Sequence, residues 1–231
     1  MRPDVIAGVS AGSVAGALYA AGVAPMRIVE LFDGRGITDF VKLRPAGGGI
    51  FAIDGFRDFL RRNLQPYRNI EDLPIPLYIG VTDFDRGVPA EFHAGALVER
   101  IVASCSIPIV FRPVEIGGVR YVDGGVLRNH PAWIIRPLCR TLIGVNVSPL
   151  ATHVKAGSIM GVAMRTYNLM AKANQKADME MCDISIETPE IAACRTFDLS
   201  MRDKVFMSGY IHTRRALRDA GLWKTSPVAT H

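Results

Sequence analysis

The hydrophobic pattern at the start of the chain predicts one strand followed by two helices. Residues 4–9 form a short apolar run, as expected for a buried strand. Residues 11–22 are mostly small and apolar and end at Gly22, which is typical of a helix with a glycine C-cap. Pro25 favours the first turn of a second helix, which we expect to reach about Asp33. The chain is therefore predicted to open with a strand, a tight turn and a helix.

The middle of the chain predicts further strands and helices. Residues 34–53 are rich in glycine and are expected to be irregular. Asp54 is the expected N-cap of a helix over 55–64, whose apolar residues share one face. These apolar residues are Phe56, Phe59 and Leu60. Two β-rich runs and one segment of helical periodicity follow, in that order, at residues 75–84, 88–92 and 96–105. A glycine pair at 117–118 separates two more extended segments and predicts a hairpin.

The last third of the chain continues the alternation. Residues 141–149 form a β-branched run typical of a strand covered on both faces. Apolar residues between 157 and 181 recur at helical spacing. They are Ile159, Val162, Ala163, Thr166, Leu169, Met170 and Ala173. A strand at 183–187 and a helix at 203–220, ending before Gly221, complete the pattern. Strands that alternate with helices indicate an α/β fold with a largely parallel sheet.

Composition is that of an ordinary globular enzyme. The chain has 231 residues, of which 49% are hydrophobic and 21% are charged, and this favours one domain over residues 1–231. We find no apolar run long enough to span a bilayer and no signal-peptide pattern at the N-terminus, so we expect a cytoplasmic protein. None of the cysteines pairs at a C-x-x-C spacing, so we expect reduced, mostly buried thiols and no zinc site. They are Cys105, Cys139, Cys182 and Cys194.

The net charge of +5 is compatible with an anionic lipid surface or with nucleic acid, but the basic residues are scattered. The densest group is interpreted as a solvated helix face, and no nucleic-acid partner is expected. It consists of Arg57, Arg61, Arg62 and Arg68. The acidic residues show no calcium-loop spacing, so no metal site is predicted either.

The stretch GVSAG, from Gly8 to Gly12, is a candidate nucleophile elbow. In such a motif, Ser10 sits on a sharp turn between a strand and a helix. We expect side chains at Gly8 and Gly12 to collide with neighbouring backbone, and the helix N-terminus to face developing negative charge. A serine hydroxyl is a weak nucleophile until a base removes its proton.

The residues leave two kinds of base open. In a Ser-His-Asp hydrolase, a histidine follows a late strand, and His153 is the best candidate for that role. The other candidate is Asp123 in the stretch YVDGG, which also fits a plain Asp-Gly turn. A carboxylate is a poor base in water but becomes more basic in a desolvated site beside a serine.

Three segments together resemble one known family. Residues 2–22 contain the G-x-S-x-G motif, residues 47–60 resemble a connection that follows the elbow, and residues 102–131 contain a Ser-Ile-Pro stretch followed by D-G-G. In these features the chain is similar to the patatin-like phospholipases, which are lipid acyl hydrolases with a Ser–Asp dyad. The resemblance covers nearly the whole chain and weakens after about residue 150.

The resemblance implies a three-layer α/β/α sandwich with a mainly parallel sheet, and a carboxylic ester hydrolase that works without metal or cofactor. The positions that carry over are Ser10 as nucleophile, Asp123 as base, Gly8 and Gly12 in the elbow, and Gly124 and Gly125 in the D-G-G motif. The backbone amide of Ala11 is an expected oxyanion donor, and His130 is given a structural or rim role. The implied partner is a phospholipid or other acyl ester, with peripheral membrane association. Core packing is expected for most of Met160, Met164 and Met170, with an acyl channel as the alternative.

The sequence departs from the family at its start. In the family, a strand, a Gly-rich oxyanion loop and a helix precede the elbow, whereas here the elbow strand begins almost at Met1. The triplet Gly47–Gly49 is interpreted as a surface loop or lid rather than as a substitute for that loop. Without the first strand and helix, apolar faces of the sheet would be exposed, so we expect a covered surface, such as that of a homodimer.

Three interpretations follow. The first is an N-terminally shortened form of an acyl hydrolase, and it is favoured because Ser10 and Asp123 are both present. The second is a catalytically impaired protein that binds lipid or a partner. The third is an α/β-hydrolase with His153 as base.

Overall fold

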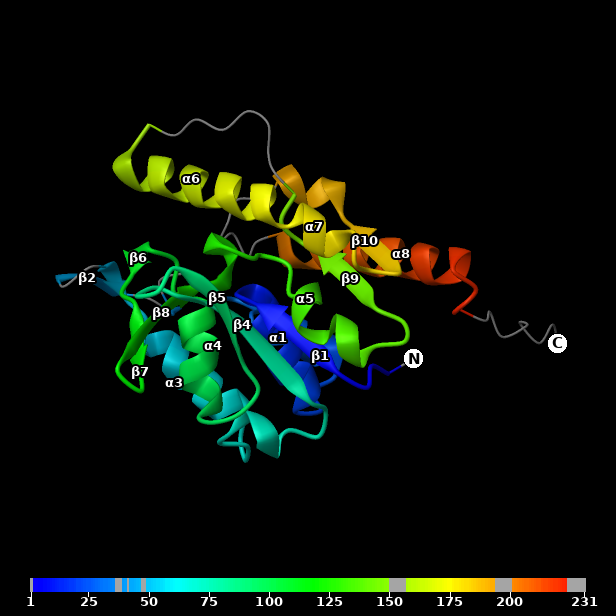
Figure 1. Cartoon of the computed structure of the whole chain (residues 1–231), viewed down its shortest axis with the longest axis horizontal. Helices are drawn as coiled ribbons and strands as arrows, with labels where there is room; N and C mark the ends of the chain where they lie inside the picture. Colours follow the sequence, from blue (N-terminus) through cyan, green and yellow to red (C-terminus); the bar gives the residue numbers. More distant parts are fainter. Residues whose placement is uncertain are drawn as a thin grey trace.

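The computed structural model describes residues 2–35, 39–40, 42–46, 49–149, 157–193 and 201–223 (Figure 1). The predicted alternation of strands and helices is present along the chain. The first helices are α1 (Ala11–Ala20), α2 (Pro25–Glu30), α3 (Asp54–Asn63), α4 (Leu97–Ser104) and α5 (Ala132–Ile135). Short 3-10 helices are η2 (Ile70–Asp72), η3 (Gly124–Val126), η4 (Arg136–Leu138) and η5 (Pro189–Ala193).

A five-stranded sheet forms the centre of the fold. Its strands are β1 (Ile6–Val9), β4 (Leu77–Asp83), β5 (Val88–Phe92), β7 (Val114–Ile116) and β8 (Val119–Asp123). The α/β class is confirmed, and the sheet is mixed: β1 and β4 are parallel, whereas the pairs β4–β5, β4–β8 and β7–β8 are antiparallel. The β4–β5 and β7–β8 pairs are local hairpins. The predicted hairpin turn is confirmed, with Gly117 at φ 61° and Gly118 at φ 80°.

Alternate residues of β4 point to opposite faces of the sheet, and both faces are covered by helices. Leu77, Ile79 and Val81 are buried in the main core, which also contains residues of α1, α3 and α4. Tyr78 packs on the opposite face, in a smaller cluster that includes Ala132 of α5. This arrangement confirms the three-layer sandwich.

Residues 34–53 differ from their prediction. They contain β2 (Lys42–Ala46) and β3 (Gly49–Ala52), which are antiparallel, and β3 also pairs in parallel with β6 (Ile109–Phe111). The expectation of irregular structure was wrong here because the pairing to β6 is long-range and leaves no local hydrophobic signature. Gly47 and Gly48 lie outside the described residues, so the interpretation of that triplet stays a prediction.

The start of α3 also differs from its prediction. Ile53, not Asp54, occupies the N-cap, and no side chain caps the helix. Asp54 instead accepts a hydrogen bond from Arg57 at 3.2 Å. The predicted apolar face is confirmed, since Phe59 and Leu60 are buried and Phe56 packs against the same core.

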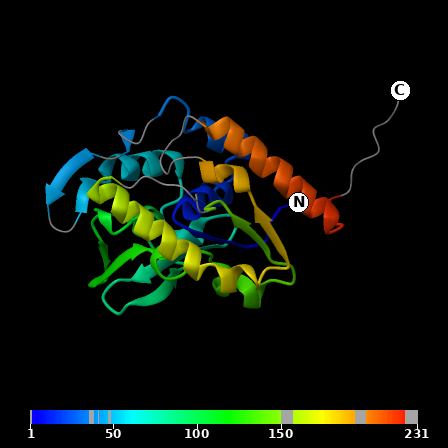
Figure 2. The same ribbon diagram turned by 90° about the horizontal axis from the view of Figure 1, so that it is seen from above.

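The C-terminal third contains a two-stranded parallel sheet of β9 (Ile143–Asn146) and β10 (Ile184–Glu187). Its helices are α6 (Ile159–Asn174), α7 (Lys176–Met179) and α8 (Arg202–Asp219). Figure 2 shows α6 (yellow) and α8 (orange) on either side of this strand pair. The expected double coverage of residues 141–149 was wrong, because β9 pairs with β10 instead of joining the central sheet. Its Val145 is 51% exposed.

The helix predicted from residues 157–181 is confirmed, but much of its apolar stripe faces outward. Ile159 is 84% exposed, and Val162, Leu169 and Met170 are exposed as well. Met160 and Met164 instead pack against the main core, as expected for most of the methionines of this region. None of the described helices combines the length and the hydropathy needed to cross a bilayer. The expected homodimer stays a prediction.

Candidate active site

Ser10 occupies a strained turn between β1 and α1. Its backbone lies at φ 52° and ψ −124°, a conformation that residues other than glycine rarely adopt. The first turn of α1 is anchored on this residue, since the amide of Ser13 and the hydroxyl of Ser13 both donate to the Ser10 carbonyl, at 2.9 and 2.7 Å. The turn therefore holds the Ser10 side chain at the N-terminal end of a helix, as the motif predicted.

The two glycines of the elbow play different parts. A Cβ atom on Gly8 would lie 2.4 Å from the Gly12 carbonyl oxygen and 2.6 Å from the Ser13 nitrogen, so only glycine fits there. A Cβ atom on Gly12 would meet no heavy atom of the described chain within 4 Å. The predicted collision is confirmed for Gly8 and wrong for Gly12, because Gly12 is the second residue of α1 and its Cβ would point into open space.

We expect Gly8→Ala to lower the free energy of unfolding by about 3 kcal/mol, because the clash is with rigid backbone. Gly12→Ala is the matched control: it is expected to raise the free energy of unfolding by about 0.5–1 kcal/mol, since alanine restricts the unfolded chain at no steric cost. Urea denaturation of the two variants and the parent chain measures both effects. Equal stabilities of the two variants would show that the elbow is not sterically closed at Gly8.

Strand pairing brings Asp123 to the same place. Gly80 pairs with Val9 of β1, and the next residue, Val81, pairs with Asp123 at the end of β8. Both Gly80 and Val81 also pair with β5. Because a strand has only two edges, β1 and β8 share the other edge of β4 and meet end to end. The residue after Val9 is Ser10, so the elbow and Asp123 face each other across one step of β4.

The glycines after Asp123 permit this close approach. A Cβ atom on Gly124 would lie 2.9 Å from the Gly80 carbonyl oxygen and 3.1 Å from a methyl group of Val9. A Cβ atom on Gly125 would overlap the hydroxyl of Tyr167. The D-G-G motif is therefore more than a common turn here, because a side chain on Gly124 would push against β4 and the elbow strand, and a side chain on Gly125 would push against Tyr167 of α6.

The Asp123 carboxyl is buried and only partly hydrogen-bonded. It is 0% exposed, its Oδ1 accepts a hydrogen bond from the Gly125 amide at 2.9 Å, and its Oδ2 has no partner at hydrogen-bond geometry among the described residues. Burial raises the pKa of Asp123 from 3.8 to about 6, opposed by the nearby Ser10 hydroxyl, the Gly125 amide and the Tyr167 hydroxyl. A carboxylate with a raised pKa and a free oxygen beside a serine hydroxyl is suited to act as a general base.

Ser104 is a site residue that the sequence did not single out. Its hydroxyl accepts a hydrogen bond from the Ser10 amide at 2.8 Å and donates one to the Gly80 carbonyl at 2.7 Å. Two residues later, the Ser106 carbonyl accepts from the Asp123 amide at 3.0 Å. The last residue of α4 and the segment just after it therefore hold the Ser10 turn and the Asp123 backbone in place beside β4. The only sequence signal was its place in the Ser-Ile-Pro stretch of residues 102–131.

The Ala11 amide remains available where a donor was predicted. Ala11 is the first residue of α1, and none of the hydrogen bonds found in the described part of the chain uses its amide. The Ser10 amide is engaged by Ser104 instead. The free amide lies next to the nucleophile at a helix N-terminus, where partial positive charge accumulates.

Cys105 is the other titratable group beside the serine. Burial, and then the negative charge of Asp123, raise the pKa of the Cys105 thiol, while the hydroxyls of Ser13 and Ser10 oppose this. Cys105 therefore stays a neutral thiol at physiological pH and is not a competing nucleophile. Cys105, Cys139 and Cys182 are free but only partly buried, so the prediction of mostly buried thiols holds only in part for these three; Cys194 lies outside the described residues.

None of the hydrogen bonds found for Ser10 or Asp123 in the described part of the chain involves a histidine. His130 is buried against Gly144 of β9, with no partner for its Nδ1 in the described structure, and burial lowers its pKa. His93 is exposed and its ring contacts Tyr78. His212 lies on α8. His153 is outside the described residues, so its role as a base stays a prediction. Among the described residues, no group of three His, Cys, Asp or Glu side chains is arranged to hold a metal ion.

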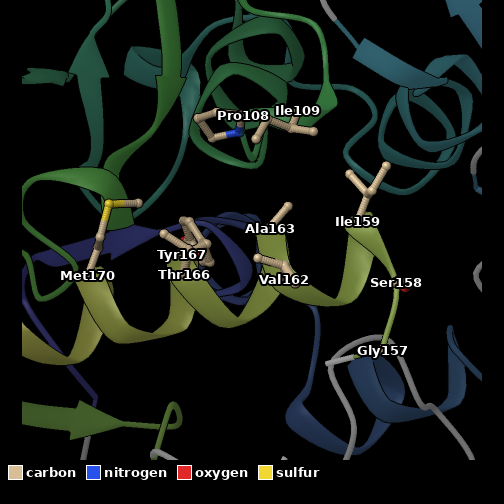
Figure 3. A pocket seen from close by; sticks show the side chains of 10 residues that line it. All are labelled: Pro108, Ile109, Gly157, Ser158, Ile159, Val162, Ala163, Thr166, Tyr167 and Met170. Carbon is tan, nitrogen blue, oxygen red and sulfur yellow. The ribbon is translucent and has the colours of Figure 1, made fainter. Parts of the chain in front are cut away.

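An apolar cavity of about 520 Å³ adjoins the site (Figure 3). One wall is formed by Pro108 and Ile109, and the other by α6 and the two residues before it. Tyr167 lines the cavity and also lies beside Asp123, so the cavity and the dyad share a residue. Met170 is the one predicted channel methionine that lines it. Ile109 has φ 73°, which is rare for a β-branched residue and typical of strain at functional sites.

Comparison with known proteins adds the family context. The family model for "Patatin-like phospholipase" matches residues 1–135. An uncharacterised NTE family protein of Mycobacterium bovis is 35% identical over 132 residues, which is 54% of this chain and 35% of that protein. A patatin-like phospholipase domain-containing protein 7 from mouse is 25% identical over 261 residues, which covers 97% of this chain and 19% of that protein. The chain thus spans about a third or less of the length of these curated relatives.

Proposed function

The chain belongs to the patatin-like phospholipase family, and from this membership and the geometry around Ser10 we propose that it is a lipid acyl hydrolase with a Ser10–Asp123 dyad. One observation carries the proposal: the strained serine and a fully buried carboxyl with an unpartnered oxygen meet at the ends of two strands that share one edge of β4. Backbone strain and a raised pKa are features that cluster at catalytic sites.

The proposed reaction has two balanced half-reactions. Asp123 takes the proton of the Ser10 hydroxyl while Ser10 Oγ bonds to the ester carbonyl carbon, and the negative charge moves to the carbonyl oxygen. The Ala11 amide donates a hydrogen bond to this oxyanion. Collapse of the tetrahedral intermediate breaks the ester bond, and Asp123 returns its proton to the departing alcohol.

Water then completes the cycle. Asp123 takes a proton from a water molecule, whose oxygen attacks the acyl-enzyme carbonyl carbon. The second tetrahedral intermediate expels Ser10 Oγ, which recovers its proton from Asp123, and the carboxylic acid is released. With a pKa of about 6, Asp123 is mostly ionised at neutral pH and still basic enough to accept a proton. No metal or cofactor takes part in these steps.

The cavity beside the dyad supports a lipid acyl chain as the part of the substrate that is bound. Its volume of about 520 Å³ lies in the range of small-molecule pockets, and aliphatic side chains dominate its walls. Ile109 and Ile159 are exposed at this cavity, and apolar side chains at a pocket mouth favour contact with a lipid surface. Peripheral membrane contact through this mouth is therefore part of the proposal.

The test is hydrolysis of p-nitrophenyl acyl esters of increasing chain length by the purified chain. We expect release of p-nitrophenol together with a mass increase equal to one acyl group on the peptide that contains Ser10. Release no faster than in buffer, with no acylated peptide, would favour the alternative of a catalytically impaired, lipid-binding protein.

A variant within the cavity tests the acyl site separately. Ala163 lines the cavity, so Ala163→Phe is expected to lower kcat/KM for a palmitoyl ester by about tenfold or more while leaving an acetyl ester nearly unchanged. Ala173→Phe is the matched control, because Ala173 lies exposed on the same helix and does not line the cavity. An equal loss for both ester lengths in Ala163→Phe would argue against acyl binding in this cavity.

A further inference from the structure

Helix α6 is fastened to the turn that carries Asp123. The amide nitrogen of the Asn174 side chain donates to the carbonyls of Gly125 and Val126, at 3.0 and 3.1 Å, and its oxygen accepts from the Asn129 amide at 2.8 Å. Asn174 is the last residue of α6, so the helix is anchored to the residues that follow Asp123. All of α6 lies beyond residues 1–135, which the family model matches.

Tyr167 lies two turns before Asn174, on the same side of α6. Its hydroxyl sits against Gly125: a Cβ atom on that glycine would lie 2.2 Å from the oxygen. Gly125 in turn donates its amide to Asp123 Oδ1. Because Gly125 has no side chain, the Tyr167 hydroxyl can lie close to it and therefore close to the buried Asp123 carboxyl that the Gly125 amide contacts. In Figure 3 its side chain comes from α6, among residues that line the cavity.

Among the described residues, few other titratable groups influence the Asp123 carboxyl. The titratable neighbours are Cys105 at the end of α4 and Tyr167 on α6, and the hydroxyl of Ser10 approaches from the elbow. The pKa of the Tyr167 phenol is raised well above 10 by burial and then by the charge of Asp123, so the phenol keeps its proton. A protonated phenol beside a carboxylate is a hydrogen-bond donor.

We propose that Tyr167 is a positioning residue for Asp123: its hydroxyl donates to the carboxylate and, with the Gly125 amide, orients it so that Oδ2 remains available to the Ser10 proton. This inference rests on the proposed function. It assigns to α6 a part in the chemistry as well as in lining the cavity. A substrate chain in the cavity would also pack against the ring of the residue that holds the base.

The test is Tyr167→Phe, which removes the hydroxyl and keeps the ring. Loss of a donor to the carboxylate raises the pKa of Asp123, so the acidic limb of the kcat/KM profile is expected to move up by about 0.5–1 pH unit. At about pH 6, where the parent carboxyl is about half ionised, kcat should fall about twofold to sixfold, and the loss should shrink as the pH rises, with KM nearly unchanged. Tyr210→Phe is the matched control, since Tyr210 is exposed on α8 and lies outside the cavity.

A second readout needs no activity. In the intact chain labelled with carbon-13 at the aspartate carboxyls, the titration midpoint of Asp123 is expected to rise in Tyr167→Phe and to stay unchanged in Tyr210→Phe. An unchanged Asp123 midpoint in Tyr167→Phe would overturn the inference. A rise in KM with an unchanged acidic limb of the kcat/KM profile would also overturn it, because Tyr167 would then only line the cavity. If the parent chain hydrolyses no ester, the proposed function fails, while the titration still decides the role of Tyr167.

Discussion

Replacing Ser10 with alanine is expected to abolish ester hydrolysis, with a loss of at least about ten thousandfold in kcat. The hydroxyl is the proposed nucleophile, and none of the neighbouring groups can replace it: the Cys105 thiol is held neutral, and the Ser13 hydroxyl donates to the Ser10 carbonyl. The measurement is initial rates with a p-nitrophenyl ester, together with covalent labelling by a fluorophosphonate. The parent chain should be labelled at Ser10, and the variant should not be labelled.

A second substitution at Ser10 separates catalysis from backbone strain. Both Ser10→Ala and Ser10→Gly remove the nucleophile, but only glycine adopts φ 52° without steric cost. Ser10→Gly should therefore be more stable than Ser10→Ala by about 1 kcal/mol in urea denaturation, with equally low activity. Hydrolysis or labelling that survives in either variant would exclude Ser10 as the nucleophile. A different nucleophile with its own base would then have to be sought.

Replacing Asp123 with asparagine is expected to lower kcat about a thousandfold. Asparagine has nearly the same shape and keeps an oxygen for the Gly125 amide, but it cannot take the proton of Ser10. The parent profile of kcat/KM should fall on the acidic side with a pKa of about 6, and this limb should disappear in the variant. Asp83→Asn is the matched control: Asp83 is a buried aspartate on neighbouring β4, outside the dyad, and its loss should leave kcat within about threefold.

The same substitution is expected to stabilise the fold at neutral pH. Between about pH 4 and pH 6 the native carboxyl holds a proton that the unfolded chain has released, so stability falls as the pH rises through this window. The rise of the pKa from 3.8 to about 6 corresponds to about 3 kcal/mol of destabilisation above that window. Asp123→Asn should thus melt at a higher temperature than the parent at about pH 7.5, with a smaller difference at about pH 4.

The activity of the same variant decides between the two candidate bases. Full ester hydrolysis by Asp123→Asn would contradict Asp123 as the base and would favour a histidine base.

The two residues of the proposed dyad stand in short sequence motifs, but the environment of these residues was not predictable from the sequence. Ser10 stands in a pattern whose backbone shape is local, because Gly8, the turn and the small residues of α1 lie within a few positions of it. The prediction that a side chain at Gly12 would collide with backbone was wrong, since a motif does not reveal which of its glycines faces backbone and which faces open space. Ser104 and Tyr167 were missed because their partners lie 94 and 44 residues away, at Ser10 and Asp123, so that neither has a local signature.

The same division holds for the fold. Strands at residues 77–83 and 88–92 were predicted within a few residues, and the one helix predicted from residues 157–181 corresponds to α6 and α7 together, because local alternation or helical spacing marks them. The pairing of β3 with β6 and the separation of β9 from the central sheet were not predicted, because both depend on which distant strand supplies the hydrogen bonds.

By itself, the sequence determined most of the elements, the α/β class, the elbow motif around Ser10 and the aspartate motif, since these follow from patterns over a few residues; it did not determine β2 and β3. Only the tertiary structure decided that β1 and β8 meet end to end on one edge of β4, which leaves Asp123 buried with a free oxygen beside Ser10. It also decided that α6 brings Tyr167 and an apolar cavity to that place. The physical reason is that burial, and with it the pKa of a carboxyl, is set by groups that are distant along the chain and adjacent only after folding.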